Sequence, residues 1–377
     1  MPASAEACTY LVVSASGRAL AQSAARQRIR VVVLDLFNDL DTRALAHASR
    51  ACASRNGRFD RGLLIEAARE LAPREGFTGL IYGSGLEGRP ALLRALAREV
   101  ALVGNAPATV AQAKDPAQLF RLLDELGIPH PAVSTAPPPN LEGWLSKRAG
   151  GAGGGHVRPA ALGWPRRERR YFQRFQAGRA MSVLFLADGH RAQIVGFNEQ
   201  WPVALSSRVP FAYGGAISTP DLPPAAEATI VRAVERLTAA TGLRGLNGLD
   251  FMLDGECAYV IEINPRPTAT LDLYDVAVPG GLLARHLDAC NGELGEPIRT
   301  EGLHRAQAIV YAQNTWQVPH GLPWPDWVTD IPAGGSTIPG GAPICTVHAQ
   351  AATSHQTRLL AFARRDQMHT LSWEKAA

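Results

Sequence analysis

The sequence predicts an α/β protein with an open α/β N-terminal domain, a larger central domain and a small β-rich C-terminal module. Three observations support this prediction. Short apolar strands alternate with helices near the N-terminus, a pair of strands joined by a tight turn occurs at 248–266, and short apolar runs separated by proline and glycine follow residue 301. At 377 residues the chain is longer than a single core usually supports, so we place the domains at 1–105, 106–300 and 301–377.

Composition and charge exclude several classes of function. The formal net charge is +4, and no basic block contains interleaved aromatic residues, so we expect no nucleic-acid partner. The five cysteines form no CxxC pair, which argues against a zinc site or a disulfide framework. No apolar run approaches the roughly 18 residues of a membrane span, and the first residues lack a signal-peptide pattern. We therefore expect a soluble cytoplasmic protein without a membrane partner.

The N-terminal part opens with a predicted β-α-β unit. Its strands are expected at 10–14 and 29–36, with a helix at 18–28 between them. Gly17 follows the first strand and Asp35 ends the second, as in some dinucleotide sites. The GxGxxG fingerprint is absent, however, so an NAD site is poorly supported.

Four further elements complete this domain: a helix at 61–72, a strand at 79–82, a helix at 90–99 and a strand near Val103. Ligands of open α/β sheets gather at the carboxyl ends of the strands. The loop at 83–87, GSGLE, follows such a strand and is a candidate substrate contact. The alternative interpretation is that it is only a turn.

The central domain begins with a predicted helix that has Lys114 and Asp115 near its start and runs to Gly127. The proline-rich stretch at 136–139 is expected to cross between subdomains. Considered alone, Lys114 is typical of a solvated helix residue.

A glycine-rich run then follows a predicted strand at 143–147. Five glycines occur within positions 150–155, directly after Lys147 and two further residues. Glycine lets backbone N–H groups approach an anion closely, and a lysine adds a point charge. The run is not a P-loop, because GxxxxGK[ST] is absent. A flexible surface loop is the alternative.

Several strands separate this run from the turn at 254–255. We expect a strand from Arg170, two strands at 182–187 and 192–197, and a helix at 224–241. The loop at 211–215 is a candidate for the substrate side of the site.

The strand pair at 248–266 holds the most specific polar pattern in the chain. A two-residue turn would pair Asp250 with Tyr259 and place Glu262 on the opposite face. A three-residue turn would pair Asp250 with Val260 and place Glu262 diagonally beside it on the same face. In the second case Asn264 and Arg266 continue along that face.

Two carboxylates, an amide and a guanidinium on one face are costly to bury unless their charge is compensated. Mg²⁺ prefers oxygen ligands and is commonly held by one or two carboxylates together with substrate phosphates. The alternative is a surface hairpin whose acids are merely solvated.

The run EINPR at 262–266 resembles the metal-binding strand of the ATP-grasp ligases. The glycine-rich run resembles the lid of that family, and the order GN-x-P, KD and LxxLGIPxP resembles the entry into its ATP-binding domain. The resemblance extends over nearly the whole chain and implies the ATP-grasp fold. It also implies that Asp250, Glu262 and Asn264 bind Mg²⁺.

The same resemblance implies how ATP is held. The phosphate contacts would be Lys114, Lys147, Gly151, Gly153, Gly154 and Gly155. The adenine contacts would come from the backbone of Gln173, Arg174 and Phe175. Many relatives place an acid after this stretch for the ribose, whereas Ala180, Met181 and Ser182 offer none, so the ribose contact is left open.

The activity implied by the resemblance is ATP-dependent joining of a small-molecule carboxylate to an amine through an acyl phosphate, with Lys147 and Arg266 in catalytic roles. The combination YGSGLE, SVLFLADG, NEQW and EINPRPT is similar to the tyramine-glutamate ligases of methanofuran and methylofuran synthesis. That similarity would make glutamate the acyl donor and a tyramine-like amine the acceptor. An ATP-binding regulator without ligase activity is the alternative, and a homodimer is compatible with the sequence.

Overall fold

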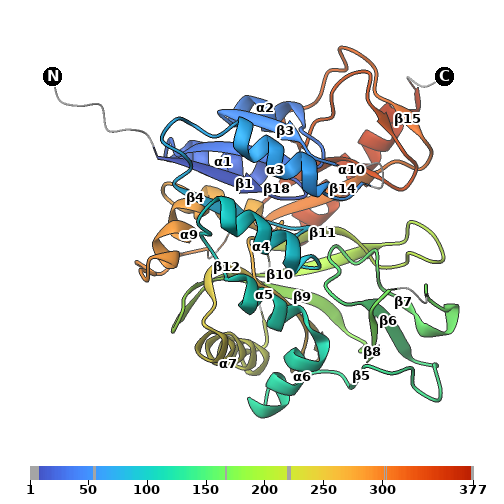
Figure 1. Cartoon of the computed structure of the whole chain (residues 1–377). Helices are drawn as coiled ribbons and strands as arrows, with labels where there is room; N and C mark the ends of the chain where they lie inside the picture. The colour runs from blue at the N-terminus through green and yellow to red at the C-terminus, as the bar shows by residue number, and fades with distance from the viewer. Residues whose placement is uncertain are drawn as a thin grey trace.

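The computed structural model describes residues 8–53, 57–165, 168–218, 222–300, 302 and 304–374. Figure 1 shows a parallel sheet with its helices at the N-terminal end, a long sheet through the middle of the molecule and a small sheet to one side. This arrangement confirms the predicted α/β class.

The N-terminal sheet is parallel and has the strand order β3-β2-β1-β4. Its strands are β1 (Thr9–Val13), β2 (Arg30–Asp35), β3 (Ala48–Ala51) and β4 (Gly79–Tyr82). Its helices are α1 (Arg18–Arg26), α2 (Leu40–Leu45), α3 (Arg61–Glu70) and α4 (Pro90–Glu99). The strands are parallel, so the loops after β1, β2 and β4 emerge at the same edge of the sheet. We had not predicted β3 and α2.

The large sheet has eight strands in the order β13-β12-β9-β10-β11-β14-β18-β16, and every neighbouring pair is antiparallel. Its strands are β9 (Arg179–Asp188), β10 (Ala192–Val203), β11 (Ala212–Ser218), β12 (Arg244–Asp254), β13 (Cys257–Asn264), β14 (Arg305–Tyr311), β16 (Val328–Thr329) and β18 (Pro343–Gln350). Strands from both sides of residue 301 therefore join one sheet. The domain boundary proposed there stays a prediction.

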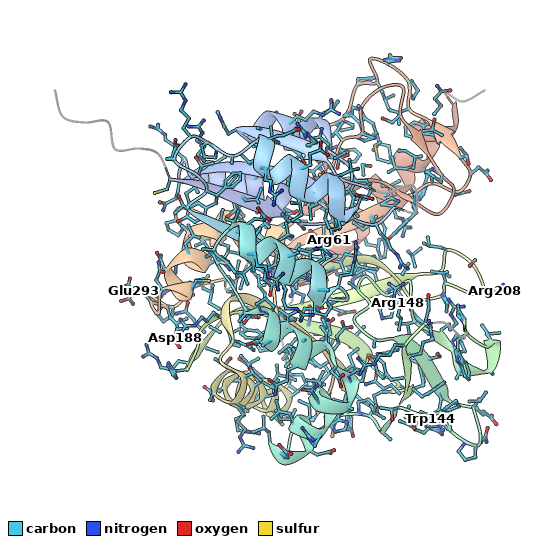
Figure 2. The ribbon with its side chains drawn as sticks, viewed as in Figure 1. Arg61, Trp144, Arg148, Asp188, Arg208 and Glu293 are labelled. Atoms are coloured by element: carbon cyan, nitrogen blue, oxygen red, sulfur yellow. The ribbon has the colours of Figure 1, made fainter. Side chains whose placement is uncertain are left out.

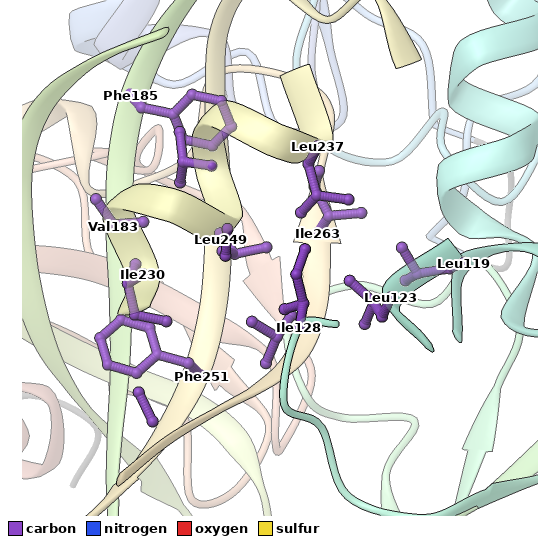
Figure 3. Packing of buried hydrophobic residues seen from close by; sticks show 14 of the residues in the cluster. Leu119, Leu123, Ile128, Val183, Phe185, Ile230, Leu237, Leu249, Phe251 and Ile263 are labelled. Atoms are coloured by element: carbon purple, nitrogen blue, oxygen red, sulfur yellow. The ribbon is translucent and has the colours of Figure 1, made fainter. Parts of the chain in front are cut away.

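Helices cover both faces of this sheet. One face packs against α6 (Pro116–Glu125) and α7 (Pro224–Thr241), and Figure 3 shows their apolar side chains meeting those of β9, β12 and β13. The other face packs against α9 (Leu282–Cys290) and α1, which connects it to the N-terminal sheet. The short helical segments α8 (Leu271–Tyr274) and η2 (Asp275–Ala277) follow β13.

The helix expected to begin near Lys114 is in fact two helices. Helix α5 (Pro107–Lys114) ends at this lysine, and Asp115 caps α6 by accepting a hydrogen bond from the Gln118 N–H at 3.1 Å. A residue that precedes proline is disfavoured in helical conformation, and Asp115 precedes Pro116. Lys114 therefore lies at a helix C-terminus, and the prediction of its place was wrong.

The small sheet lies beside the large one and contains the glycine-rich run. Its strands are β5 (Val133–Ser134), β6 (Trp144–Arg148), β7 (Arg158–Pro159) and β8 (Arg170–Arg174), in the order β5-β8-β6-β7, and η1 (Ala160–Leu162) follows β7. In Figure 2, Trp144 lies at the end of β6 farther from the N-terminal sheet, and Arg148 lies at the nearer end. The glycines begin at that nearer end.

The C-terminal part contains a long helix that the sequence analysis missed, since it was expected to be a β-rich module. Helix α10 (Ser354–Glu374) packs on β14 and β18. The rings of Phe362 and Trp201 meet edge to face, with centroids 5.2 Å apart. Two short strands, β15 (Trp316–Gln317) and β17 (Thr337–Ile338), form a separate pair. In the part of the chain described, no helix is long and apolar enough to cross a bilayer.

Candidate active site

A cavity of about 1310 Å³ lies between the N-terminal sheet, the small sheet and the large sheet. Its wall includes the loops that follow β1, β2 and β4, the glycine-rich run, and parts of β8, β9, β12, β13 and β14. The loop at 83–87 lines this cavity, as expected for a loop at the carboxyl end of a parallel strand.

The register of the β12–β13 hairpin differs from both alternatives drawn from the sequence. Asp250 pairs directly with Glu262, while the next pair is Phe251 with Val260. Ile261 is therefore an extra residue on β13, a β-bulge. The predicted partners of Asp250 were wrong because a turn length alone cannot reveal an inserted residue farther along the strand. The bulge places the two carboxylates side by side.

The carboxylate pair continues a row of polar residues across the sheet. Asp250 also pairs with Ser182 of β9, and Ser182 pairs with Asn198 of β10. The amide of Gln200 donates to Asp250 Oδ1 at 3.1 Å, and the amide of Asn264 donates to Asp250 Oδ2 at 3.0 Å. Asp250 is thus oriented by two amides.

Lys114 reaches this row from the end of α5. Its ammonium donates to Glu262 Oε1 and, at 2.9 Å, to Asn264 Oδ1. The break between α5 and α6 is what ends the helix here and brings the lysine to β13. The structure therefore brings together Lys114, Asp250, Glu262 and Asn264, four of the predicted site residues.

Lys147, near the end of β6, is a buried cation of the cavity wall. It is only 5% exposed, yet its ammonium makes no hydrogen bond or ion pair with any described residue. Burial lowers the pKa of Lys147, while the charges of Glu262 and Asp250 act in the opposite direction. An anionic ligand in the cavity would supply the partner that the protein does not.

The two carboxylates have different protonation tendencies. Burial and the charge of Glu262 raise the pKa of Asp250 to about 6. Burial also acts to raise the pKa of Glu262, but the charges of Lys114 and Lys147, together with the interaction with His156, outweigh it and hold that pKa below its ordinary value. Glu262 is therefore the carboxylate that ionises first, and a bound cation would favour ionisation of Asp250 as well.

The oxygen atoms of Asp250, Glu262 and Asn264 fit Mg²⁺ provided that a bound ligand adds further oxygens. Asp250, Glu262 and Asn264 present oxygen atoms side by side, and the Lys114 ammonium already contacts two of these residues. Across the described ranges, no group of three or more His, Cys, Asp or Glu residues is arranged to hold a metal. A Mg²⁺ ion here would therefore need further oxygens from a ligand such as a phosphate.

Arg266, just beyond the end of β13, forms a buried ion pair. Its guanidinium contacts the carboxylate of Glu87, in the loop after β4, and donates to the Pro267 carbonyl oxygen at 2.9 Å. Burial opposes the ionisation of Glu87, yet the charges of Arg266 and Lys114 hold its pKa below its ordinary value. The pair connects the loop after β4 of the N-terminal sheet to the end of β13. Arg266 lines the cavity but is engaged by the protein.

The glycine-rich run is packed closely against the rest of the site. Gly154 has φ +72°, and a Cβ at this position would collide with the carbonyl oxygen of Phe211. A Cβ at Gly151 would collide with the ring of His156, whose Nδ1 has no partner. Gly153 and Gly155 meet no such obstacle: no atom lies within 4 Å of a Cβ at Gly153, and the nearest atom to one at Gly155 is 3.8 Å away.

The predicted adenine stretch forms the end of β8. The N–H groups of Arg174 and Phe175 donate to the carbonyl oxygens of Ala132 and Gly143, each at 2.8 Å, so these donors are already engaged. Gln173 is buried and its side-chain amide nitrogen has no partner. Phe175 is 51% exposed. All three predicted residues line the cavity.

Sequence reasoning did not assign roles to Gln200 or His156, and it treated Glu87 only as part of a candidate substrate loop. Gln200 and Glu87 lie within the motifs NEQW and YGSGLE, but only the sheet register and a long-range ion pair show their partners. His156 is buried, and burial lowers its pKa to about 4. Its position directly after the glycines was the available signal.

Comparison with known proteins identifies the architecture. Residues 113–270 match the ATP-grasp domain family. A search of curated protein sequences found no match.

Solved structures of similar fold cover nearly the whole chain. The biotin carboxylase domain dimer of Hydrogenobacter thermophilus 2-oxoglutarate carboxylase, in complex with MgADP, ADP and bicarbonate, has a TM-score of 0.69 at 14% identity, covering 91% of this chain and 86% of that one. N5-carboxyaminoimidazole synthase from Aspergillus clavatus, with ADP and 5-aminoimidazole ribonucleotide, has a TM-score of 0.69 at 14% identity and covers 96% and 99%. An L-amino acid ligase from Bacillus licheniformis has a TM-score of 0.68 at 14% identity and covers 96% and 97%. The chain therefore has the ATP-grasp fold, and its residues 113–270 match the ATP-grasp domain family.

Proposed function

We propose that this protein is an ATP-dependent ligase that joins a small-molecule carboxylate to an amine, with ATP and Mg²⁺ bound in the cavity. One observation is central to the proposal. Lys147 and two directly paired carboxylates line one wall of the cavity, and Lys147 has no partner within the described protein. A second buried lysine, Lys114, contacts one of these carboxylates, Glu262. This arrangement suits a ligand that combines phosphates with a divalent cation.

The proposed roles follow from the chemistry of phosphoryl transfer, which requires mainly positioning and charge neutralisation. Asp250, Glu262 and Asn264 would hold Mg²⁺ against the phosphates. The ammonium groups of Lys114 and Lys147 would neutralise phosphate oxygens, and Lys114 would leave its present contacts with Glu262 and Asn264 as the metal binds.

The glycine-rich run would cover the phosphates. Gly151, Gly153, Gly154 and Gly155 have no side chains that would shield their backbone N–H groups, and closure would exclude water from a reactive intermediate. The N–H groups of Gly151 and Gly155 donate to the carbonyl oxygens of Arg148 and Gly153 at 3.1 and 2.9 Å, so they would leave these contacts to bind a phosphate. Beyond the run, Gln173 offers the adenine an unsatisfied amide, and Arg174 and Phe175 complete that end of the cavity.

The proposed reaction has two steps. A carboxylate oxygen attacks the γ-phosphorus of ATP, and the bond to the β-γ bridging oxygen breaks to release ADP. The amine nitrogen then attacks the acyl carbon, the bond to phosphate breaks, and the nitrogen loses a proton. Arg266, held in place by Glu87, would orient the carboxylate, because its planar guanidinium fits oxyanions.

We also propose which carboxylate and which amine the protein joins. The motifs similar to tyramine-glutamate ligases support glutamate as the acyl donor and a tyramine-like amine as the acceptor, in one-carbon cofactor synthesis. The name of one structural relative, an L-amino acid ligase, is compatible with an amino acid substrate. A homodimer is a further proposal, since one structural relative is described as a domain dimer.

The experiment that tests the proposal follows ADP release from the full chain with ATP and Mg²⁺. Carboxylates including L-glutamate are added singly, and amines including tyramine are added in a second series. ADP release that requires a carboxylate, with an amide product when an amine is present, is the expected result. Binding of Mg·ATP without ADP release for any pair would favour the alternative, an ATP-binding regulator.

A further inference from the structure

A second group of charged residues lies at the opposite end of the same cavity, where the N-terminal sheet meets the C-terminal part of the chain. It contains five carboxylates and one guanidinium, and we call it the acidic cluster. Its members are Arg18, Asp35, Asp39, Asp41, Asp272 and Asp330. The catalytic roles proposed above use none of them.

Arg18 donates hydrogen bonds to two of the carboxylates, and its Nε also lies 4.0 Å from Asp41 Oδ2. Its guanidinium donates to Asp272 Oδ1 at 3.0 Å and to Asp330 Oδ1 at 3.3 Å. Asp330 also accepts from the hydroxyls of Ser16 at 2.9 Å and Thr346 at 2.6 Å. This part of the cluster is a satisfied network.

Two more carboxylates are held by backbone N–H groups. Asp35 accepts from the N–H groups of Gly17 and Asn38 at 3.2 and 2.6 Å. Asp41 accepts from those of Asp330 and Ile331 at 2.7 and 3.2 Å. These bonds fix the loop after β2 and leave both carboxylates with structural roles.

Asp39 is different. Its side chain lines the cavity and the residue is only 7% exposed, yet its carboxylate makes no hydrogen bond or ion pair with the described residues. Burial, together with the charges of Asp330, Asp35 and Asp41, raises its pKa to about 8. A buried acid beside other acids needs a positive partner in order to ionise.

A second, independent group also faces this cavity without a partner. Gln307 of β14 is 1% exposed, and its amide nitrogen donates to the Tyr213 hydroxyl at 2.9 Å and to the Ala269 carbonyl oxygen at 3.1 Å. Its Oε1 accepts no hydrogen bond. Asp39 and Gln307 therefore each lack a hydrogen-bond donor.

We propose that this end of the cavity binds the ammonium group of a substrate, with the Asp39 carboxylate as its counter-ion. An ammonium group provides one positive charge and three donors, which matches the unpartnered Asp39 carboxylate and the surplus of carboxylates around it. A metal ion suits the cluster less well, since the described residues offer no group of three or more ligands in suitable positions.

This inference rests on the proposed function and specifies its substrate class: a compound that carries a primary amine. Two sources share that chemistry, an amino acid that donates its carboxylate and an amine that accepts the acyl group. Asp39 and the two paired carboxylates of β12 and β13 line the same cavity. A substrate anchored at Asp39 would therefore extend toward the phosphates.

The test is a calorimetric titration of the full chain with matched pairs of ligands in the presence of Mg·ADP, which permits no turnover. The pairs are L-glutamate with glutarate, tyramine with tyrosol, and putrescine with butane-1,4-diol. The wild-type protein should bind at least one amine about tenfold or more tightly than its partner that lacks nitrogen. The glutamate pair reports an amino acid donor, and the other two pairs report an amine acceptor.

The Asp39→Asn variant should lose this preference while its affinity for the partner without nitrogen is unchanged. Asp366→Asn, at an exposed site on α10, is the matched control and should behave as wild type. No preference in the wild-type protein, or a preference retained in Asp39→Asn, would overturn the inference. Binding of Mg·ADP in the same samples separates the two proposals: failure of nucleotide binding with a retained ammonium preference refutes only the ligase proposal.

Discussion

Each end of the cavity contains a buried charged group without a partner, and the two groups have opposite charges. At the β12–β13 end, Lys147 is a buried ammonium without a described partner, beside the Lys114–Glu262 ion pair. At the other end, Asp39 is a buried carboxylate without one, beside the network of Arg18. Buried charges are normally paired, so each end is complete only when a ligand of the matching charge is present. A phosphate ligand suits the first end and an ammonium ligand the second.

The largest expected effect concerns the carboxylates of the first end. Glu262→Gln keeps the shape of the side chain but removes the charge that would compensate Mg²⁺, so ADP formation should fall by roughly three orders of magnitude or more. Glu256→Gln, in the turn of the same hairpin, is the control and should stay near wild type. Circular dichroism should show both variants folded. Full activity in Glu262→Gln would remove the metal assignment.

The second prediction concerns the ion pair that holds the first end to the N-terminal sheet. Glu87→Gln leaves Arg266 buried without its counter-ion, so the free energy of unfolding should fall by about 3–5 kcal/mol, measured by urea denaturation. Glu99→Gln breaks the exposed pair with Arg69, whose charges are screened by solvent, and should have a much smaller effect. Equal losses in the two variants would show that burial of the Glu87 pair has no special effect.

Because the pKa of Glu87 lies below its ordinary value, the stability from this pair is present above the unfolded-state pKa of about 4.3. It is lost as the pH falls through the lower folded-state pKa. The difference between wild type and Glu87→Gln should therefore shrink on acidification.

The third prediction concerns the unpartnered ammonium. Lys147→Met keeps an unbranched side chain but removes the charge, so the dissociation constant of Mg·ADP should rise roughly tenfold to a hundredfold. Arg121→Met, on the exposed face of α6, removes a cation elsewhere and is the control. Calorimetric titration measures both. Unchanged affinity in Lys147→Met would indicate that phosphates bind elsewhere.

The smallest expected effect is on the stability of the ligand-free protein. It comes from Asp39 at the second end of the cavity, and it depends on pH. The folded-state pKa of Asp39, about 8, lies above the unfolded value of about 3.9, so the folded protein holds an extra proton between these values. This contribution to stability declines as pH rises from about 4 to about 8. The groups that act on Asp39 are Asp35, Asp41, Asp330 and Arg18.

Asp39→Asn cannot ionise, so its melting temperature should match wild type near pH 5 and exceed it by several degrees near pH 8. Differential scanning calorimetry at the two pH values makes the comparison. A constant difference across this range would show that Asp39 has an ordinary pKa.

Local patterns in the sequence predicted most of the helices and strands. They also predicted several of the residues that lie together at the first end of the cavity. The strand at 79–82 and the helices at 90–99 and 224–241 have the predicted bounds, because apolar periodicity and flanking prolines are local signals. The motif EINPR identified Glu262 and Asn264 within three residues of each other. Asp250 lies on the neighbouring strand of the same hairpin, so its proximity needed only a short connection.

The second end could not be predicted in this way. Asp39 follows β2, whereas Asp330 and Thr346 come from the far end of the chain, and the backbone contacts of Asp41 with this region span 289 and 290 residues. No periodicity or motif relates residues so distant. The helix α10 was missed as well, because the few apolar residues of this polar stretch do not mark out one face.

The sequence by itself determined the fold class, the β12–β13 hairpin and the residue types at the first end, since these depend on periodicity and on short motifs. The tertiary structure decided three things: the bulge that pairs Asp250 with Glu262, the helix break that brings Lys114 to them, and the meeting of the N-terminal loops with the C-terminal part at Asp39. Each depends on how separate elements pack. Packing selects one register and one set of distant neighbours from many that the local sequence permits.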